Sequence, residues 1–245
     1  MPLLETRALS RTFGGLKAVD GVDLSLSDGE ILGVIGPNGA GKTTLFSLIA
    51  GSLPPTAGDI LLDGRSIAGR PAHRVVRDGV VRTHQIVRPF ANLSVADNVA
   101  VAALHGGGRA SGHARDRAGE VLEFAGLSDR AGDMPGSLTL AGRKRLELAR
   151  ALATAPRVLM LDEVIAGVSP AEAMALAALV RRIRDQRGVS VIMIEHVMPA
   201  VMSLSDRVVV LDHGRKIAEG TPAQVAEDPG VIEAYLGPGH RGAHP

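Results

Sequence analysis

Short apolar runs alternate with amphipathic stretches along most of this chain. Four runs are rich in apolar residues and end in polar or turn residues: residues 31–35, 79–85, 157–163 and 189–194. Runs of this length are typical of strands that are buried on both faces. Stretches with apolar residues every three or four positions separate them and predict helices. Strands that alternate with helices indicate an α/β fold with a mainly parallel sheet.

The N-terminal part of the chain has a different pattern. Residues 3–13 and 17–27 predict two strands, the second of which partly alternates apolar and polar positions. The pair Asp28-Gly29 that follows is a turn signal of the hairpin kind. The chain is therefore expected to open with antiparallel strands. Further short strands are predicted at residues 59–62, 207–211 and 215–218.

Residues 86–155 carry helical patterns and no convincing strand. We interpret them as a helical subdomain inserted between the two halves of a core, residues 1–85 and 156–237. The antiparallel strands form a β subdomain of this core. Residues 238–245 are rich in glycine, proline and histidine and predict a disordered tail. The predicted helices of the insert cover residues 94–104, 115–125 and 143–155.

A glycine-rich segment follows the strand at residues 31–35 and precedes a helical run. Its residues are Gly36, Pro37, Asn38, Gly39, Ala40, Gly41, Lys42, Thr43 and Thr44. This order matches the phosphate-binding loop (P-loop), whose glycines let backbone amides approach phosphate oxygens. Lys42 is expected to reach the β- and γ-phosphates, and the Thr43 hydroxyl to bind Mg²⁺. The alternative is a turn-rich loop with a stray lysine, but the flanking strand and helix favour the P-loop.

The P-loop predicts a nucleoside triphosphate ligand, which kinases, GTPases, helicases and transporter motors all bind. The amino-acid composition argues against some of the functions that P-loop proteins carry out. Aromatic residues make up 2% of the chain, which argues against stacking platforms for single-stranded nucleic acid. A formal net charge of +1 does not require a nucleic-acid partner either, and the lack of cysteine excludes thiolate chemistry. Neither a signal peptide nor an apolar run of about 20 residues is evident, so we expect any membrane role to act through a partner.

Chemically active side chains follow the ends of the predicted parallel strands. Gln85, Asp162, Glu163 and His196 stand at these ends, as the P-loop does. Ligands of open α/β sheets bind beyond the carboxyl ends of the strands, so we expect these groups to converge. Asp162 is expected on the Mg²⁺ side, and Glu163 can act on a water. A helix N-cap or a solvated turn is the alternative for the acidic pair, and a core or helix-start position is the alternative for His196.

In this order the motifs resemble those of the ATPase subunit of an ABC transporter. The resemblance extends over nearly the whole chain up to Gly237. It includes Leu-Thr-Leu-Ala-Gly at residues 138–142, where that family carries its signature motif. Finer features are similar to the branched-chain amino acid uptake group. They are found at residues 13–19, 82–85, 166–170, 219–222 and 234–237.

The resemblance implies an ATP hydrolase that uses ATP and Mg²⁺. Phe13 would then stack on the adenine ring, although the residues alone leave a core position open. Gln85 would sense Mg²⁺ and the γ-phosphate, and Asp162 would act on the metal side. Glu163 would be the general base, and His196 would be a switch at the γ-phosphate.

The resemblance also implies partners and a location. Two such subunits work head to tail, as a homodimer or a heterodimer, and Thr139 and Ala141 would complete the ATP site of the partner subunit. The other partners would be integral membrane permease subunits and, indirectly, a solute-binding protein, with no nucleic acid. The chain would lie peripherally on the cytoplasmic face of the inner membrane.

Some residues depart from the family's usual motifs. These departures are expected to affect the efficiency of the ATP site shared with the partner subunit and the coupling to the membrane subunits, more than ATP binding itself. A plain N-cap is the alternative role for the hydroxyl of Thr139. These departures are compatible with an unequal heterodimer. The departing residues are His84, Leu140, Ala141, Gly142 and Val164.

The predicted function is to power uptake of branched-chain or related amino acids. The nearest alternative is an ABC motor for another solute or for lipid or lipopolysaccharide export. A soluble ABC ATPase of DNA repair or translation would usually need coiled-coil arms or two cassettes in one chain. A P-loop kinase would need an acceptor site and a lid, whereas Glu163 and His196 suit water as the acceptor.

Overall fold

The computed structural model describes residues 1–83, 88–106 and 114–236. Gln85 and its neighbour His84 lie outside the described residues, as does the predicted tail at residues 238–245. In the described part, no helix combines the length and the apolar character that a membrane crossing requires.

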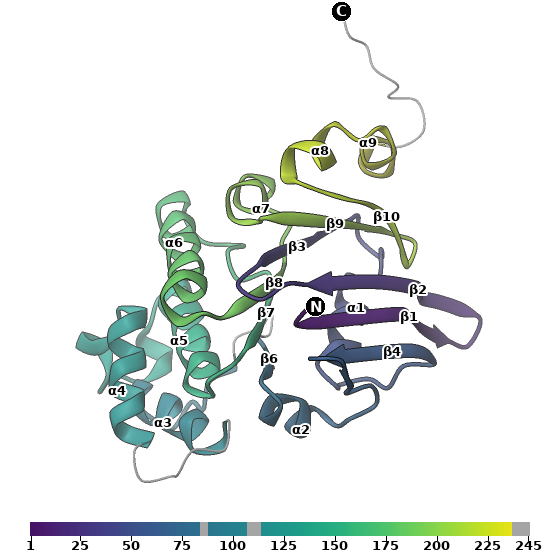
Figure 1. Ribbon diagram of the computed structural model, residues 1–245. Coiled ribbons are helices and arrows are strands. Elements are labelled where there is room, and N and C mark those ends of the chain that lie inside the picture. The colour runs from purple at the N-terminus through teal and green to yellow at the C-terminus, as the bar shows by residue number, and fades with distance from the viewer. Residues whose placement is uncertain (84–87, 107–113, 237–245) are drawn as a thin grey trace, which may run out of the picture.

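A six-stranded sheet forms the centre of the molecule, in the order β10-β9-β3-β8-β7-β6 (Figure 1). The neighbours from β9 to β6 pair in parallel, and β10 pairs antiparallel with β9. The predicted α/β fold with a mainly parallel sheet is therefore confirmed. The strands are β3 (Ile31–Ile35), β6 (Val80–Arg82), β7 (Val158–Asp162), β8 (Ser190–Ile194), β9 (Arg207–Asp212) and β10 (Arg215–Gly220).

Two hydrophobic cores lie on opposite faces of this sheet. On β3, Ile31 and Ile35 belong to one core, and Leu32 and Val34 belong to the other. The first core includes the helices that follow β6, and the second includes α1 (Lys42–Ile49) and the N-terminal strands. Because both faces are covered, these strands are apolar at successive positions.

A second, antiparallel sheet has the order β2-β1-β4-β5, with α2 (Ala72–Arg77) following it in the chain. Leu4 pairs with Leu26 on one side and with Leu62 on the other. The predicted antiparallel start of the chain is therefore confirmed. The strands are β1 (Leu4–Phe13), β2 (Leu16–Leu26), β4 (Ala57–Leu62) and β5 (Arg65–Ser66).

Three helices pack against one another beside the central sheet: α3 (Val95–His105), α4 (Ala114–Ala125) and α5 (Leu140–Ala153) (Figure 1). The predicted start of the last helix at Arg143 is wrong. α5 begins earlier because the Thr139 side chain caps it by accepting a hydrogen bond from the Gly142 amide, 3.1 Å away. The division of the chain into subdomains stays a prediction.

The C-terminal third contains α6 (Pro170–Arg187), α7 (Met198–Leu204), α8 (Pro222–Glu227) and α9 (Pro229–Leu236). α6 starts with a capping box of Ser169 and Glu172 and ends at Gly188, whose φ is 63°. The sequence analysis predicted no helix for α7 beyond the helix-start alternative for His196, which lies two residues before it. Val197 precedes this helix and offers no side-chain cap, so a proline in the first turn is the start signal that the sequence offers.

Candidate nucleotide site

The P-loop connects the end of β3 to the start of α1, and two of its glycines lie against other backbone. A Cβ on Gly36 would meet the Leu211 carbonyl oxygen at 2.1 Å. A Cβ on Gly41 would meet the Ala18 carbonyl oxygen at 2.3 Å. Both glycines also have positive φ, 150° and 97° respectively. The loop is therefore wedged between β9 of the central sheet and β2 of the antiparallel sheet.

Lys42 is the first residue of α1 and folds back over the P-loop. Its Nζ donates hydrogen bonds to the carbonyl oxygens of Gly36 and Pro37, over 2.7 and 2.9 Å. Burial lowers the pKa of Lys42, and the charges of Glu163 and Asp162 oppose that shift. The ammonium group is thus bonded to the backbone of the loop, and the charges of Glu163 and Asp162 stabilise its protonated form.

Asp162 ends β7 and is buried. Its Oδ2 accepts a hydrogen bond from the Arg82 guanidinium over 2.6 Å. The same guanidinium donates to Ser47 Oγ of α1 over 2.9 Å and lies 5.8 Å from the centre of the Phe46 ring. Arg82 therefore joins the ends of β6 and β7 to the helix that follows the P-loop.

Glu163 follows directly in a strained turn, with a φ of 52° that residues other than glycine rarely adopt. Its amide donates to the Ile194 carbonyl oxygen over 2.9 Å. Its Oε1 lies 3.6 Å from Nδ1 of His196, which follows β8 and is largely exposed. The helix N-cap alternative for the acidic pair is wrong, because Ser169 caps α6. The core alternative for His196 is wrong as well.

Phe13 stands at the end of β1 and is 43% exposed, so the core alternative for this residue is wrong. The Arg11 guanidinium lies 4.6 Å from the centre of its ring. Phe13 pairs with Leu16 across the turn that leads to Ala18, the residue packed against the P-loop. An exposed aromatic ring on this side of the loop is suited to stacking on a base.

Thr139 and Ala141 lie at the N-terminus of α5. The Thr139 Oγ1 serves as the N-cap, so the alternative role foreseen for this hydroxyl is observed. Its proton can still be donated to a phosphate oxygen, because the cap uses the oxygen as an acceptor. Ala141 is 7% exposed. Backbone amides at a helix N-terminus attract anions.

The Mg²⁺ expectation can be tested on the donor set. Among the described residues, no group of three or more His, Asp or Glu side chains could hold a metal ion. Mg²⁺ typically takes one or two protein ligands and completes its shell with water and phosphate oxygens. The carboxylate of Asp162 and the hydroxyl of Thr43 fit that mode of binding.

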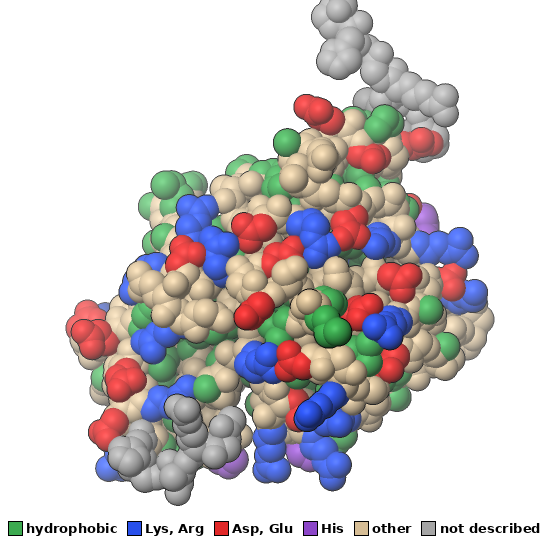
Figure 2. Space-filling view, in the orientation of Figure 1, with side chains coloured by type: hydrophobic (Ala, Val, Ile, Leu, Met, Phe, Trp, Pro, Cys, Tyr) green, Lys and Arg blue, Asp and Glu red, His purple; other side chains and the backbone are tan. Residues whose placement is uncertain are grey.

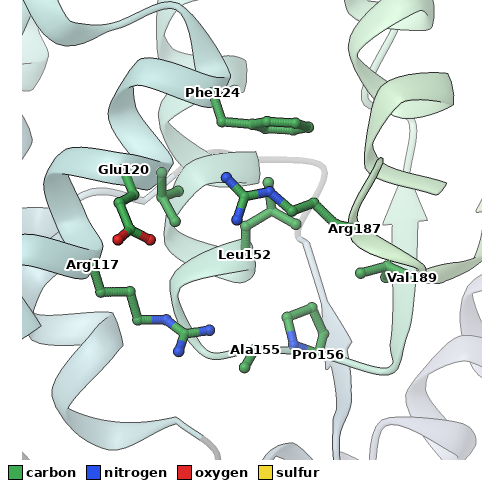
Figure 3. A pocket seen from close by; sticks show the side chains of 9 residues that line it. Arg117, Glu120, Phe124, Leu152, Ala155, Pro156, Arg187 and Val189 are labelled. Carbon is green, nitrogen blue, oxygen red and sulfur yellow. The ribbon is translucent and has the colours of Figure 1, made fainter. Parts of the chain in front are cut away.

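Three hollows can be compared with the predicted site residues. One, of about 640 Å³, lies beside the P-loop. Another, of about 250 Å³, lies between α4, the end of α5 and the end of α6, and contains none of the predicted site residues (Figure 3). The first is lined by residues 37–40 of the P-loop, the turn between β9 and β10, and α9, and therefore contains part of the P-loop but not Lys42 or Asp162. A third, of about 240 Å³, is lined by Thr139 and Ala141 at the start of α5.

The structure thus brings together the P-loop, Asp162, Glu163 and His196 at the carboxyl ends of β3, β7 and β8, as the sequence predicted. Gln85 lies outside the described residues. Sequence reasoning named Arg82 within the resemblance but gave it no role at the site, although a charged residue inside a predicted buried strand is a signal that it has a partner. It also missed Lys144 and Glu195, both buried.

Comparisons with known proteins agree with this geometry. A family model described as ABC transporter matches residues 19–166. A second model, described as branched-chain amino acid ATP-binding cassette transporter, matches residues 215–239.

Curated relatives match along the full length. The high-affinity branched-chain amino acid transport ATP-binding protein BraF of Pseudomonas aeruginosa is 43% identical over 250 residues, covering 96% of this chain and 98% of its own length. The corresponding protein LivG of Escherichia coli K12 is 42% identical with the same coverage. The lipopolysaccharide export system ATP-binding protein LptB of that strain is 34% identical, covering 97% and 98%.

Solved structures match equally far. A nucleotide-free ATP-binding cassette from an ABC transporter has a TM-score of 0.89 at 31% identity, covering 96% of this chain and 99% of its own. The ADP conformation of an ATP-binding cassette of an ABC transporter also has a TM-score of 0.89, at 30% identity, covering 97% and 99%.

Proposed function

The chain belongs to the ABC transporter family of ATP-hydrolysing transport subunits, and on that premise we propose that its transporter takes up branched-chain or related amino acids. The observation that carries this proposal is the match of residues 215–239 to the branched-chain amino acid model. The identities of 43% and 42% to relatives named for that transport support it.

We assign the following roles at the chain's own ATP site. The amides of the P-loop bind the phosphates, and Lys42 neutralises their charge. Phe13 stacks on adenine. Asp162 and Thr43 would hold Mg²⁺, which would supply positive charge against the phosphate oxygens.

The proposed reaction converts ATP and water to ADP and phosphate. Glu163 accepts a proton from the attacking water, and its position at the end of β7 suits that role. His196 lies 3.6 Å from that carboxylate and is placed to contact the γ-phosphate. The proposed role of Gln85 rests on its position in the sequence.

The proposed partners follow from the architecture of the family. A second ATPase subunit, the same or different, would be paired head to tail, so that Thr139 and Ala141 contact its ATP. Permease subunits in the membrane would bind the pair on the cytoplasmic face of the inner membrane, and a solute-binding protein would act indirectly through them. Figure 2 shows Lys and Arg interspersed with Asp and Glu on the face drawn, which does not resemble a nucleic-acid stripe.

Reconstitution tests the substrate. The full chain would be co-expressed with permease subunits of a branched-chain amino acid transporter, purified as a complex and placed in liposomes with a solute-binding protein for these amino acids. We expect ATP-dependent uptake of labelled leucine, and little uptake of lysine. A complex that moves no amino acid, or a chain that co-purifies with lipid-export permeases, would favour the motor role of the relative named for lipopolysaccharide export.

A further inference from the structure

A buried lysine connects α5 to the residue proposed as general base. Lys144 lies in the second turn of α5 and is 6% exposed. Its Nζ donates to the carbonyl oxygen of Glu163 over 2.9 Å and to that of Ala166 over 2.6 Å. A buried ammonium group is costly unless its protons are bonded, so this side chain is tied firmly to the segment after β7.

The segment of residues 163–169, here called the post-β7 loop, is held from a second side. Glu195, at the end of β8, is 1% exposed, and its Oε1 accepts a hydrogen bond from the Ile165 amide over 2.7 Å. Burial raises the pKa of Glu195 and lowers that of Lys144, and the two opposite charges oppose both shifts. The loop therefore lies between a cation from α5 and a carboxylate from β8.

Lys144 follows Ala141 by three residues on the same helix, roughly one turn away. A helix moves as a rigid rod over such a distance, so a shift of the α5 N-terminus also shifts the attachment point of Lys144. Glu163 has a φ of 52°, which the surrounding contacts must maintain. The conformation of the Glu163 peptide therefore depends on the position of Lys144 Nζ, which donates a hydrogen bond to the Glu163 carbonyl oxygen.

We infer that Lys144 is a positioning residue. Through its hydrogen bond it makes the orientation of the Glu163 peptide group depend on the position of the α5 N-terminus. Nucleotide contacted in the partner subunit by Thr139 and Ala141 thereby aligns Glu163 for hydrolysis at the chain's own site. This inference rests on the proposed ATP site and adds a link between the two sites of a pair.

The test compares turnover with dimer formation in the full chain. Lys144→Met removes the donors while keeping much of the apolar stem. We expect kcat for ATP to fall about 10- to 100-fold, because small misplacement of a catalytic group has effects of this size. The second quantity is the ATP concentration that half-saturates dimerisation, measured by light scattering in a Glu163→Gln background. It should stay within about 2-fold of the value without Lys144→Met, because Lys144 is not expected to contact ATP.

Two further variants sharpen the comparison. Arg143→Met removes a charge from the exposed adjacent position of α5 and should change neither quantity. Lys144→Arg keeps the charge and the donors and should restore much of kcat. If Lys144→Met is insoluble, Lys144→Gln takes its place.

A double-mutant cycle with Thr139→Ala tests the proposed route. If Lys144 acts through the α5 N-terminus, the two losses of kcat should combine less than multiplicatively. Multiplicative losses, an unchanged kcat, or a parallel loss of dimerisation and turnover would each overturn the inference. Failure of the ATP site itself would show separately, as turnover that survives Glu163→Gln.

Discussion

The Arg82 guanidinium contacts the Asp162 carboxylate over 2.6 Å, and the two side chains are 9% and 6% exposed. A buried carboxylate of this kind needs a cation beside it. Arg82 supplies that charge within the chain, and Mg²⁺ is proposed to be held by the same carboxylate. We therefore expect the contribution of this ion pair to the stability of the fold to depend on whether the proposed nucleotide site is occupied.

Arg82→Met should destabilise the protein by about 3–5 kcal/mol, because it leaves Asp162 buried without its partner. Saturating Mg-ATP should recover part of this loss, since the metal would bring positive charge to Asp162. Urea unfolding of the variant and the wild-type chain, with and without Mg-ATP, measures the loss of stability and the part of it that Mg-ATP recovers. ATP without Mg²⁺ is the control. A loss below about 1 kcal/mol, the size of an exposed pair, would show that the ion pair is dispensable.

Lys42→Ala should weaken ATP binding at least tenfold, because a hydrogen bond from a charged donor contributes about 1.5–3 kcal/mol. Equilibrium binding of a fluorescent ATP analogue would measure the effect. Lys216→Ala, on β10, is a matched loss of one positive charge and should leave affinity unchanged. Equal affinities for Lys42→Ala and the wild-type chain would remove Lys42 from the phosphate site.

Glu163→Gln should reduce steady-state hydrolysis by about 10²- to 10⁴-fold, the range for loss of a general base. ATP binding should persist, and light scattering should show a dimer with Mg-ATP and a monomer without it. Glu123→Gln, at an exposed position of α4, is the control. Retained turnover would exclude Glu163 as the base, and a monomer that binds ATP would indicate a different ATPase subunit as partner.

The buried Glu195 predicts a specific pH dependence of stability. Burial raises its pKa above the ordinary value of 4.5, so the folded protein keeps a proton that the unfolded chain releases. The resulting stabilisation is complete below pH 4.5 and is lost as the pH rises through the folded pKa.

Glu195→Gln removes that titration. The stability of this variant relative to the wild-type chain should therefore increase as the pH rises from about 4.5 upward. Thermal unfolding of both proteins across this range, with the exposed Glu123→Gln variant as reference, gives the comparison. Parallel stability curves would show that the Glu195 pKa is not raised in the folded state.

The fold could be predicted because buried strands, caps and the P-loop are encoded locally. The P-loop glycines, the acidic end of β7 and the capping box at Ser169 each lie within a few residues in the sequence. Chain order and the parallel sheet then bring the strand ends together.

Contacts between distant segments could not be predicted in the same way. Arg82 and Asp162 are 80 positions apart, and Lys144 meets Ala166 across 22 positions. Their pairing depends on which strands are neighbours and on how α5 packs. The sequence offers Thr139 as a possible cap, but the exposed Leu140 interrupts the apolar pattern in the first turn of α5. β6 ends at Arg82 and does not include Thr83, which the predicted strand contained.

The packing of Gly36 and Gly41 against carbonyl oxygens of two different sheets has a consequence for gene copies that lose their motor activity. A side chain at either position would disturb the scaffold even in a protein that never meets ATP. Selection for folding alone would still retain both glycines in such a copy, whereas the identity of residue 42 would no longer be under selection for ATP binding. In relatives that have lost activity, retained glycines at these positions therefore indicate that the fold is intact, whereas a retained lysine indicates that ATP is still bound and hydrolysed.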